Sequence, residues 1–151
     1  MHLAMWRILD ASALVRISNH KMDEAPIGYL IPDTIEHAKT LIIHYQKLDP
    51  KLGMVYAIWN HLRIIGYIQL FHVKDSIWEV GYYIDMNYQN KGHMSAALAK
   101  LIKMVEKQHT FMIMQARVLK NNQASIQVLK HNGFLLINQW DDLLCYHRSL
   151  S

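Results

Sequence analysis

The chain has 151 residues, of which 52% are hydrophobic and 19% are charged. This composition excludes a disordered or collagen-like chain, and a single cysteine, Cys145, excludes both an intrachain disulfide and a zinc site built from cysteines. A formal net charge of +4 favours anionic partners.

No linker, repeat or low-complexity tract divides the sequence, and no apolar run approaches the roughly 20 residues of a membrane span. The ten histidines show no spacing typical of a metal site. We therefore expect residues 1–151 to form one cytoplasmic domain without a metal ion or a membrane partner.

The first fifty residues predict one strand and two helices. The expected elements are a strand over 2–9, a helix over 10–19, a loop over 22–32 and a helix over 33–48. Asp10 is the expected N-cap of the first helix, and Asp33 with Glu36 forms a D-x-x-E capping box for the second.

Three strands follow, because β-branched and aromatic residues dominate 54–59, 64–73 and 77–84. The polar breaks between them, at residues 60–61 and 74–76, have the length of hairpin turns. These three strands should therefore pair antiparallel.

The rest of the chain alternates helices and strands. The expected elements are a polar loop over 85–91, an amphipathic helix over 92–108, a strand over 111–118, a helix over 123–131, and strands over 134–140 and 143–147. Gly133 is placed to end the last helix. The prediction is an α+β domain with a mixed, mostly antiparallel sheet of about six to seven strands and about four helices.

Two segments point to chemistry. A polar loop over residues 88–93 turns directly into a long helix, and the unpaired N–H groups of such a helix start suit a phosphate or pyrophosphate. Asn122 and Ser125 stand at another helix start. Each segment also has a plain structural interpretation, since a glycine can simply punctuate the chain, Asn122 can be an N-cap and Ser125 a first-turn hydroxyl.

In order and spacing, four segments resemble the GNAT acetyltransferase superfamily and, within it, the RimJ/RimL-like branch. They are Ile64–Ile68, Trp78–Ile84, Gln89–Met94, and Asn122–Ser125 followed by Gly133 and Phe134. The resemblance covers about residues 53–147 and implies the GNAT fold, with acetyl-CoA as co-substrate.

The resemblance also implies where acetyl-CoA binds: in a V-shaped opening between the strand of Glu79 and the strand of Phe111. The implied pantetheine contacts are the backbone of Ile84, Asp85 and Met86 together with Asn122. The implied pyrophosphate cradle is the N–H groups of Gln89, Asn90, Lys91, Gly92, His93 and Met94. Met94 departs from the family pattern, which has Gly or Ala there, and we expect a tighter loop with binding retained.

The family reaction is direct attack of an amine on the thioester in a ternary complex. Glu79 matches the branch glutamate and is the candidate base, directly or through a water, although a strand carboxylate can also simply face solvent. A strand bulge near residues 84–86 should free an N–H for the oxyanion. Leu129 stands where many members have an acidic tyrosine, so Ser125 is the candidate for the leaving thiolate, with Tyr88 or Tyr146 as substitutes.

The acceptor carries no signature. A protein or peptide α-amine is the first hypothesis, while a small amine or a polyamine is the alternative. For a polyamine, Asp23, Glu24 and Asp33 in and beside the 22–32 loop would supply acidic groups. A non-catalytic acyl-CoA-binding module and a basic nucleic-acid-binding domain are alternatives from other classes, but no RNA-binding signature appears and we expect no nucleic-acid partner. A homodimer is left open.

Overall fold

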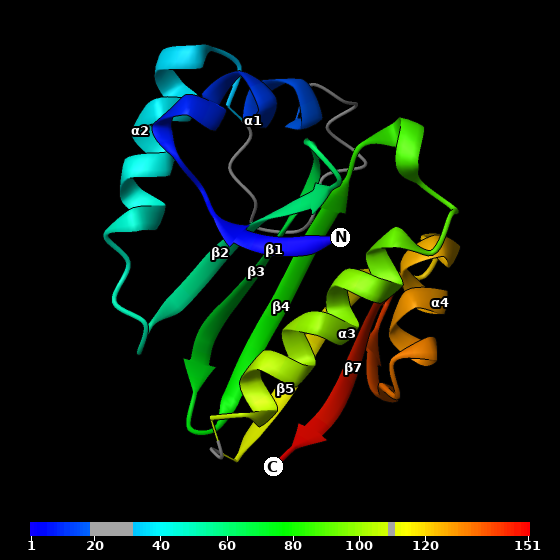
Figure 1. The fold of residues 1–151 in the computed structure, drawn as a ribbon. Helices are drawn as coiled ribbons and strands as arrows, with labels where there is room; N and C mark the ends of the chain where they lie inside the picture. The colour runs from blue at the N-terminus through cyan, green and yellow to red at the C-terminus, as the bar shows by residue number, and fades with distance from the viewer. Residues whose placement is uncertain (19–31, 109–110) are drawn as a thin grey trace.

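The computed structural model describes residues 1–18, 32–108 and 111–151 (Figure 1). One seven-stranded sheet has the strand order β1-β2-β3-β4-β5-β7-β6. The strands are β1 (His2–Met5), β2 (Gly53–Asn60), β3 (Arg63–Lys74), β4 (Ile77–Ile84), β5 (Met112–Leu119), β6 (Leu135–Trp140) and β7 (Leu143–Leu150). The α-helices of these residues are α1 (Ala11–Ser18), α2 (Ile35–Gln46), α3 (His93–Glu106) and α4 (Gln123–His131), joined by two short 3₁₀ helices, η1 (Ile8–Asp10) and η3 (Met86–Tyr88).

Every neighbouring pair of strands is antiparallel except β4 and β5, which are parallel. The two hairpin turns that join β2, β3 and β4 contain His61 and Asp75 at φ values of 54° and 48°. This left-handed conformation is typical of tight turns. The predicted α+β architecture with a mostly antiparallel sheet is confirmed.

Helices cover the sheet on both faces and form two apolar cores. α3 and α4 pack on one face, where their apolar residues join those of β3, β4, β5 and β7. α1 and α2 pack on the other face against β2, β3 and β4. Figure 1 shows α4 beside α3, with α1 and α2 together at the other end of the sheet.

The N-terminal segment differs from its prediction. The strand ends at Met5 rather than Leu9, because the Asp10 carboxylate accepts hydrogen bonds from the Arg7 backbone N–H at 3.0 Å and from Arg7 Nη2 at 2.7 Å, which folds the chain into η1. Asp10 therefore lies in η1, and α1 begins at Ala11. The predicted end of this helix at Asn19 and most of the 22–32 loop lie outside the described residues.

The caps of α2 and α3 are also specific. The N-cap of α2 is Thr34, whose Oγ1 accepts the N–H of His37 at 3.1 Å, so the predicted Asp33 cap is wrong by one residue. Asp33 instead lies 3.5 Å from His37 Nδ1. α3 begins at His93, after Gly92 at φ 80°. α4 has the predicted bounds and is followed by Gly133, also at φ 80°.

Candidate active site

The sheet opens between β4 and β5. These strands pair only from Ile77 with Ile113 to Glu79 with Gln115, and beyond that point they diverge. A cavity of about 1060 Å³ fills the space between them and continues between α3 and α4. This size suits a ligand larger than a single amino acid. The structure therefore contains the predicted V-shaped opening.

The backbone of β4 presents hydrogen-bonding groups to this opening. The Asp85 N–H donates to the Ile65 carbonyl at 2.7 Å, and the Ile113 N–H donates to the Ser76 carbonyl at 2.8 Å, so odd-numbered residues of β4 face β3 and even-numbered ones face β5. Alternate residues of a strand direct their N–H and C=O to opposite neighbours. Beyond the last pair, the β4 residues whose backbone groups face the opening are therefore Tyr82 and Ile84.

These groups are freed by strand divergence rather than by the predicted bulge. The β3–β4 register is unbroken from Gly66–Ile84 to His72–Trp78, and it shifts only beyond His72, far from residues 84–86. Because β5 leaves β4 after Glu79, the strand edge loses its partner without any extra residue. The result, unpaired donors beside the cavity, is the same.

Three of the predicted ligand contacts do not line the cavity: Asp85, Met86 and Lys91. Asp85 is buried, its N–H points to β3, and its Oδ1 accepts the Asn87 N–H at 3.0 Å. Lys91 Nζ donates to the Asn87 carbonyl at 3.1 Å. These residues shape the loop, while the cavity is lined by the other predicted ones, namely Glu79, Ile84, Gln89, Asn90, Gly92, His93, Met94, Asn122 and Ser125.

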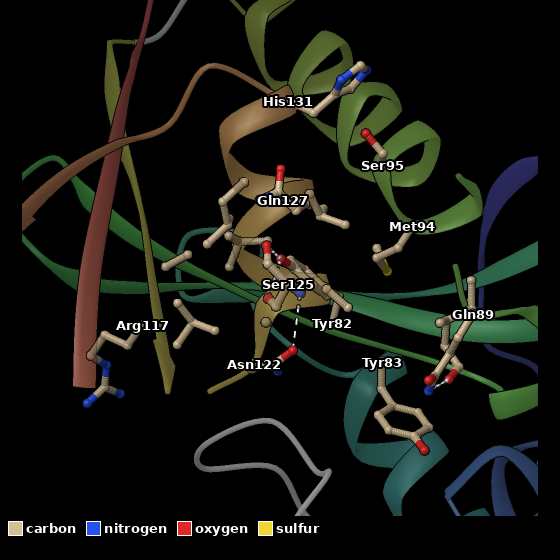
Figure 2. Close-up of a pocket in the computed structure, with 18 of the residues that line it drawn as sticks. Tyr82, Tyr83, Gln89, Met94, Ser95, Arg117, Asn122, Ser125, Gln127 and His131 are labelled. Atoms are coloured by element: carbon tan, nitrogen blue, oxygen red, sulfur yellow. Dashed lines mark hydrogen bonds between the residues drawn. The ribbon is translucent and has the colours of Figure 1, made fainter. Parts of the chain in front are cut away.

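The start of α3 forms one end of the cavity. Asn90 and Gly92 have φ values of 58° and 80°, and no side chain caps the helix at Gly92. The first-turn N–H groups of a helix have no intrahelical partner and carry the positive end of the dipole. Gln89 Nε2 donates to the Ile84 carbonyl at 3.1 Å, which ties this loop to the end of β4 (Figure 2). The arrangement suits an anion such as a phosphate.

Met94 is the second residue of α3 and is 7% exposed. Its side chain belongs to the apolar core between α3 and the sheet. The residue that departs from the family pattern is therefore accommodated by burial, and its backbone N–H stays in the first turn of the helix.

The start of α4 forms the wall of the cavity opposite β4. Asn122 is the N-cap, and its Oδ1 accepts the Ser125 N–H at 3.1 Å. The Ser125 hydroxyl lies 2.8 Å from the hydroxyl of Tyr82. Figure 2 shows these three side chains together at the centre of the cavity. The Asn122 amide oxygen is used by the cap, which leaves its NH₂ group as the part that can donate to a ligand.

Glu79 lies in a polar network on the face of the sheet that carries α1 and α2. Its Oε1 accepts from Arg117 Nε at 2.5 Å and from Gln115 Nε2 at 3.1 Å, and its Oε2 accepts from Arg117 Nη2 at 2.8 Å. The hydrogen bond to Glu79 raises the pKa of Arg117. Gln115 Oε1 lies 2.8 Å from His147 Nε2, and burial lowers the pKa of His147. Burial raises the pKa of the neighbouring Cys145 thiol, which disfavours its reactive thiolate form.

Tyr82 and Arg117 are among the lining residues that the sequence patterns did not identify as site residues. Tyr82 belongs to a segment that the resemblance identified, and its alternation with Glu79 along the strand could have placed it on the opposite face. Arg117 had no signal, because its contact with Glu79 depends on the register of β4 and β5. Of the two substitute tyrosines, Tyr88 lines the cavity and Tyr146 is buried on β7.

Within residues 1–18, 32–108 and 111–151, no group of three or more His, Cys, Asp and Glu side chains is placed to hold a metal ion. In the same part of the chain, no helix has the length and apolar character needed to cross a membrane. Residues 23 and 24, the acidic pair of the predicted acceptor loop, lie outside the described residues.

Comparison with solved structures shows the fold. A RimL ribosomal L7/L12 α-N-protein acetyltransferase in complex with coenzyme A matches with a TM-score of 0.85 and 17% identity, over 98% of this chain and 93% of that chain. RimJ of Mycobacterium smegmatis in complex with CoA-disulfide matches with a TM-score of 0.83 and 19% identity, over 97% and 80%. The microcin C7 self-immunity acetyltransferase MccE, in complex with acetyl-CoA and AMP, matches with a TM-score of 0.82 and 15% identity, over 98% and 91%.

No curated protein matches the sequence significantly. The family model of the acetyltransferase (GNAT) domain, however, matches residues 1–135, which is most of the chain. The fold of the sheet, its opening between β4 and β5, and the helix start at the end of that opening agree with this match. The chain therefore belongs to the GNAT family of acetyltransferases, with the fold of the RimJ/RimL-like branch.

Proposed function

We propose that residues 1–151 act as one enzyme domain that transfers the acetyl group of acetyl-CoA to the N-terminal α-amine of a protein or peptide. The main support for acetyl-CoA as the donor is that the unpaired edge of β4 and the start of α3, which no side chain caps, line one cavity. The CoA and acetyl-CoA complexes of the structural neighbours support the same donor.

The chemistry of acetyl-CoA fits this cavity. The two amides of the pantetheine arm can pair with the backbone groups of Tyr82 and with the N–H of Ile84, whose carbonyl already accepts from Gln89, as a short extra strand would. The pyrophosphate can accept from the first-turn N–H groups of α3, beginning at His93. The Asn122 NH₂ group, on the opposite wall, can donate to the same arm.

The charge of the described lining residues suits an α-amine, which carries at most one positive charge. Among the described residues that line it, Glu79 is the only carboxylate, and Arg117 neutralises it through two hydrogen bonds. A polyamine carries several positive charges and needs several acidic groups. An α-amine has a pKa of about 8, so a sizeable fraction is neutral near pH 7 and less deprotonation by the enzyme is needed.

The reaction uses this chain's groups as follows. The amine nitrogen attacks the thioester carbonyl carbon, and the oxyanion that forms can accept from N–H groups of β4 that face the opening. The proton lost by the amine passes to Glu79, directly or through a water. The C–S bond then breaks, its electron pair moves to sulfur, and Ser125 hydrogen-bonds to the departing thiolate.

Thermal melting with and without acetyl-CoA tests the donor, because a ligand of the folded state raises the melting temperature. Release of free thiol then tests the acceptor. The panel is one peptide with a free N-terminus, the same peptide blocked at the N-terminus but carrying lysine, and spermidine. We expect release only with the free α-amine. Thiol release with spermidine alone would contradict the proposal that the acceptor is an α-amine. A melting temperature raised by acetyl-CoA without thiol release from any amine favours a non-catalytic acyl-CoA-binding module.

Glu79→Gln tests the base. The amide keeps the shape of the side chain but cannot take a proton, so kcat/KM should fall about 100-fold or more near pH 7. Raising the pH deprotonates the α-amine without help and should narrow the difference from the parent protein. Glu36→Gln is the matched control, because Glu36 is an exposed carboxylate that pairs with Lys39 on α2. This substitution should change neither kcat/KM nor its dependence on pH. Equal kcat/KM for Glu79→Gln and parent removes Glu79 from the reaction.

A further inference from the structure

A tyrosine and a serine from different elements share a hydrogen bond inside the cavity. The Tyr82 hydroxyl oxygen lies 2.8 Å from Ser125 Oγ and 3.4 Å from the Ser125 carbonyl oxygen. Tyr82 belongs to β4 and Ser125 to the first turn of α4 (Figure 2). The two hydroxyl groups therefore meet only after α4 has packed against the sheet.

Ser125 is held at two points. Asn122 Oδ1 accepts the backbone N–H of Ser125 at 3.1 Å, which fixes the first turn of α4. Tyr82 contacts its hydroxyl, which otherwise rotates to suit any partner. Together the two contacts fix where the serine oxygen lies and in which direction its hydrogen can point.

The direction of the hydrogen bond follows from acidity. A phenol, with an ordinary pKa of about 10, is a stronger acid than an aliphatic alcohol and so the better donor of the pair. Burial raises the pKa of Tyr82 to about 12, so the phenol keeps its proton at neutral and mildly alkaline pH. When Tyr82 donates into Ser125 Oγ, the serine hydrogen is left for a third group, and a hydrogen bond received by an oxygen strengthens the one it donates.

We propose that Tyr82 is a positioning residue that directs the Ser125 hydroxyl toward the sulfur of the departing thiolate; this rests on the proposed function. As the C–S bond breaks and its electron pair moves to sulfur, Ser125 donates a hydrogen bond to the thiolate, which then takes its proton from water. A thiol has a pKa of about 8.5, so this hydrogen bond suffices and no serine alkoxide is formed. The pair thus serves the leaving group in a chain that has Leu129 where many family members have an acidic tyrosine.

A double-mutant cycle on turnover gives the first test, with Tyr82→Phe, Ser125→Ala and the double variant. Loss of one neutral hydrogen bond should lower kcat of Tyr82→Phe about 3- to 10-fold with the KM for acetyl-CoA unchanged. The double variant should lie within about twofold of Ser125→Ala, because Tyr82 acts through Ser125. Independent, multiplicative losses overturn the proposal, as does an unchanged kcat in Tyr82→Phe.

Tyr56→Phe is the matched control. Tyr56 lies opposite Ile68 on β3, and Ile68 lies opposite Tyr82, so both tyrosines occupy one row on one face of the sheet. Tyr56 does not line the cavity. Its substitution removes the same hydroxyl and should leave kcat and KM unchanged.

The thiol of bound CoA gives a readout that does not depend on turnover. If Ser125 donates to the sulfur, the parent protein stabilises the thiolate, and the ultraviolet absorbance of the thiolate as a function of pH gives its pKa. The acid dissociation constant of the bound thiol should be about 3- to 10-fold smaller in both Tyr82→Phe and Ser125→Ala than in the parent or in Tyr56→Phe. Ser125→Ala approaches the same contact from α4, so the test survives if Tyr82→Phe does not fold.

The outcomes separate the two proposals. CoA that stabilises the parent protein but has the same thiol pKa in all variants overturns the role of Tyr82 alone. CoA and acetyl-CoA that leave the melting temperature of the parent unchanged overturn the proposed function, and the role of Tyr82 with it.

Discussion

Replacing Gly92 with alanine tests whether the loop before α3 binds the pyrophosphate, because the effects on stability and on acetyl-CoA binding can be measured separately. Gly92 is the N-cap of α3 and has a φ of 80°. A Cβ built there meets no heavy atom within 4 Å. The substitution therefore causes no clash in the protein itself, and the added methyl group occupies open space at the end of the cavity where a phosphate would approach the helix.

The cost to stability is small and follows from the backbone. A left-handed conformation costs a non-glycine residue about 1–2 kcal/mol. The loss of unfolded-state freedom on replacing glycine with alanine offsets about 0.4–1 kcal/mol of this. The net loss is about 1 kcal/mol, which for a chain of this size lowers the melting temperature by about 2–4 °C.

Gly92→Ala should also remove a large part of the rise in melting temperature that acetyl-CoA causes. Acetyl-CoA at about 100 times its Kd stabilises the folded state by about 2.7 kcal/mol, which corresponds to a rise of about 5–11 °C. A methyl group that moves the pyrophosphate away from the helix N–H groups should weaken binding at least tenfold, or about 1.4 kcal/mol. At the same ligand concentration, about 3–5 °C of the rise should then be lost.

Gly133→Ala is the control for this assay. Gly133 also has a φ of 80°, it follows α4, and its added Cβ would lie 3.6 Å from Arg148 Nη1, an ordinary contact. Gly133→Ala should lower the melting temperature about as much as Gly92→Ala while the acetyl-CoA-induced rise stays complete. A Gly92→Ala variant that keeps the full rise refutes the assignment of the α3 start as the pyrophosphate site.

Two further predictions concern stability. Met94→Ala should lower the free energy of unfolding by about 2–5 kcal/mol, because the side chain lies in the core. Calorimetry of the folded variant should give an unchanged dissociation constant for acetyl-CoA. A large loss of affinity would mean that the side chain itself contacts the ligand. Burial lowers the pKa of His147 in the folded state, so the unfolded chain binds a proton at this imidazole more readily than the folded chain does. The contribution of neutral His147 to folding stability is therefore complete above the unfolded pKa of about 6.5, and it is lost as the pH falls below that value. His147→Gln should therefore reduce the fall in melting temperature between pH 7 and pH 5, and an unchanged pH profile would contradict the burial effect.

Local pattern was enough to predict much of the fold. The residues of β4 and α4 have their predicted bounds, and the two hairpins lie at the predicted turns, because alternation, helical spacing and short polar breaks are properties of consecutive residues. The motifs around Gly92 and Ser125 were also visible, since each depends on a helix start encoded within a few residues. Most of the site residues that the family resemblance implied line one cavity.

Choices between neighbouring polar residues were decided by geometry that the pattern does not contain. Asp33 and Thr34 are both good N-caps in sequence, and only the backbone path into α2 gave that role to Thr34. Asp10 likewise does not cap α1, because its carboxylate accepts hydrogen bonds from the backbone N–H and the guanidinium of Arg7. Which of two neighbouring polar residues caps a helix depends on hydrogen bonds to residues nearby in the folded chain. Residue propensities do not distinguish between the two positions.

The site itself depends on contacts between distant segments. The register of β4 and β5 brings Arg117 to Glu79, and the divergence of the same strands, not a bulge, exposes the β4 backbone. The packing of α4 on the sheet brings Ser125 to Tyr82. Neighbours along the chain are enough to set which residue types stand at the helix starts and on the strand faces, so these features can be predicted without coordinates. Which side chains meet, and which backbone groups stay open to a ligand, was decided by the tertiary structure, because those distances exist only once the strands have paired and the helices have packed.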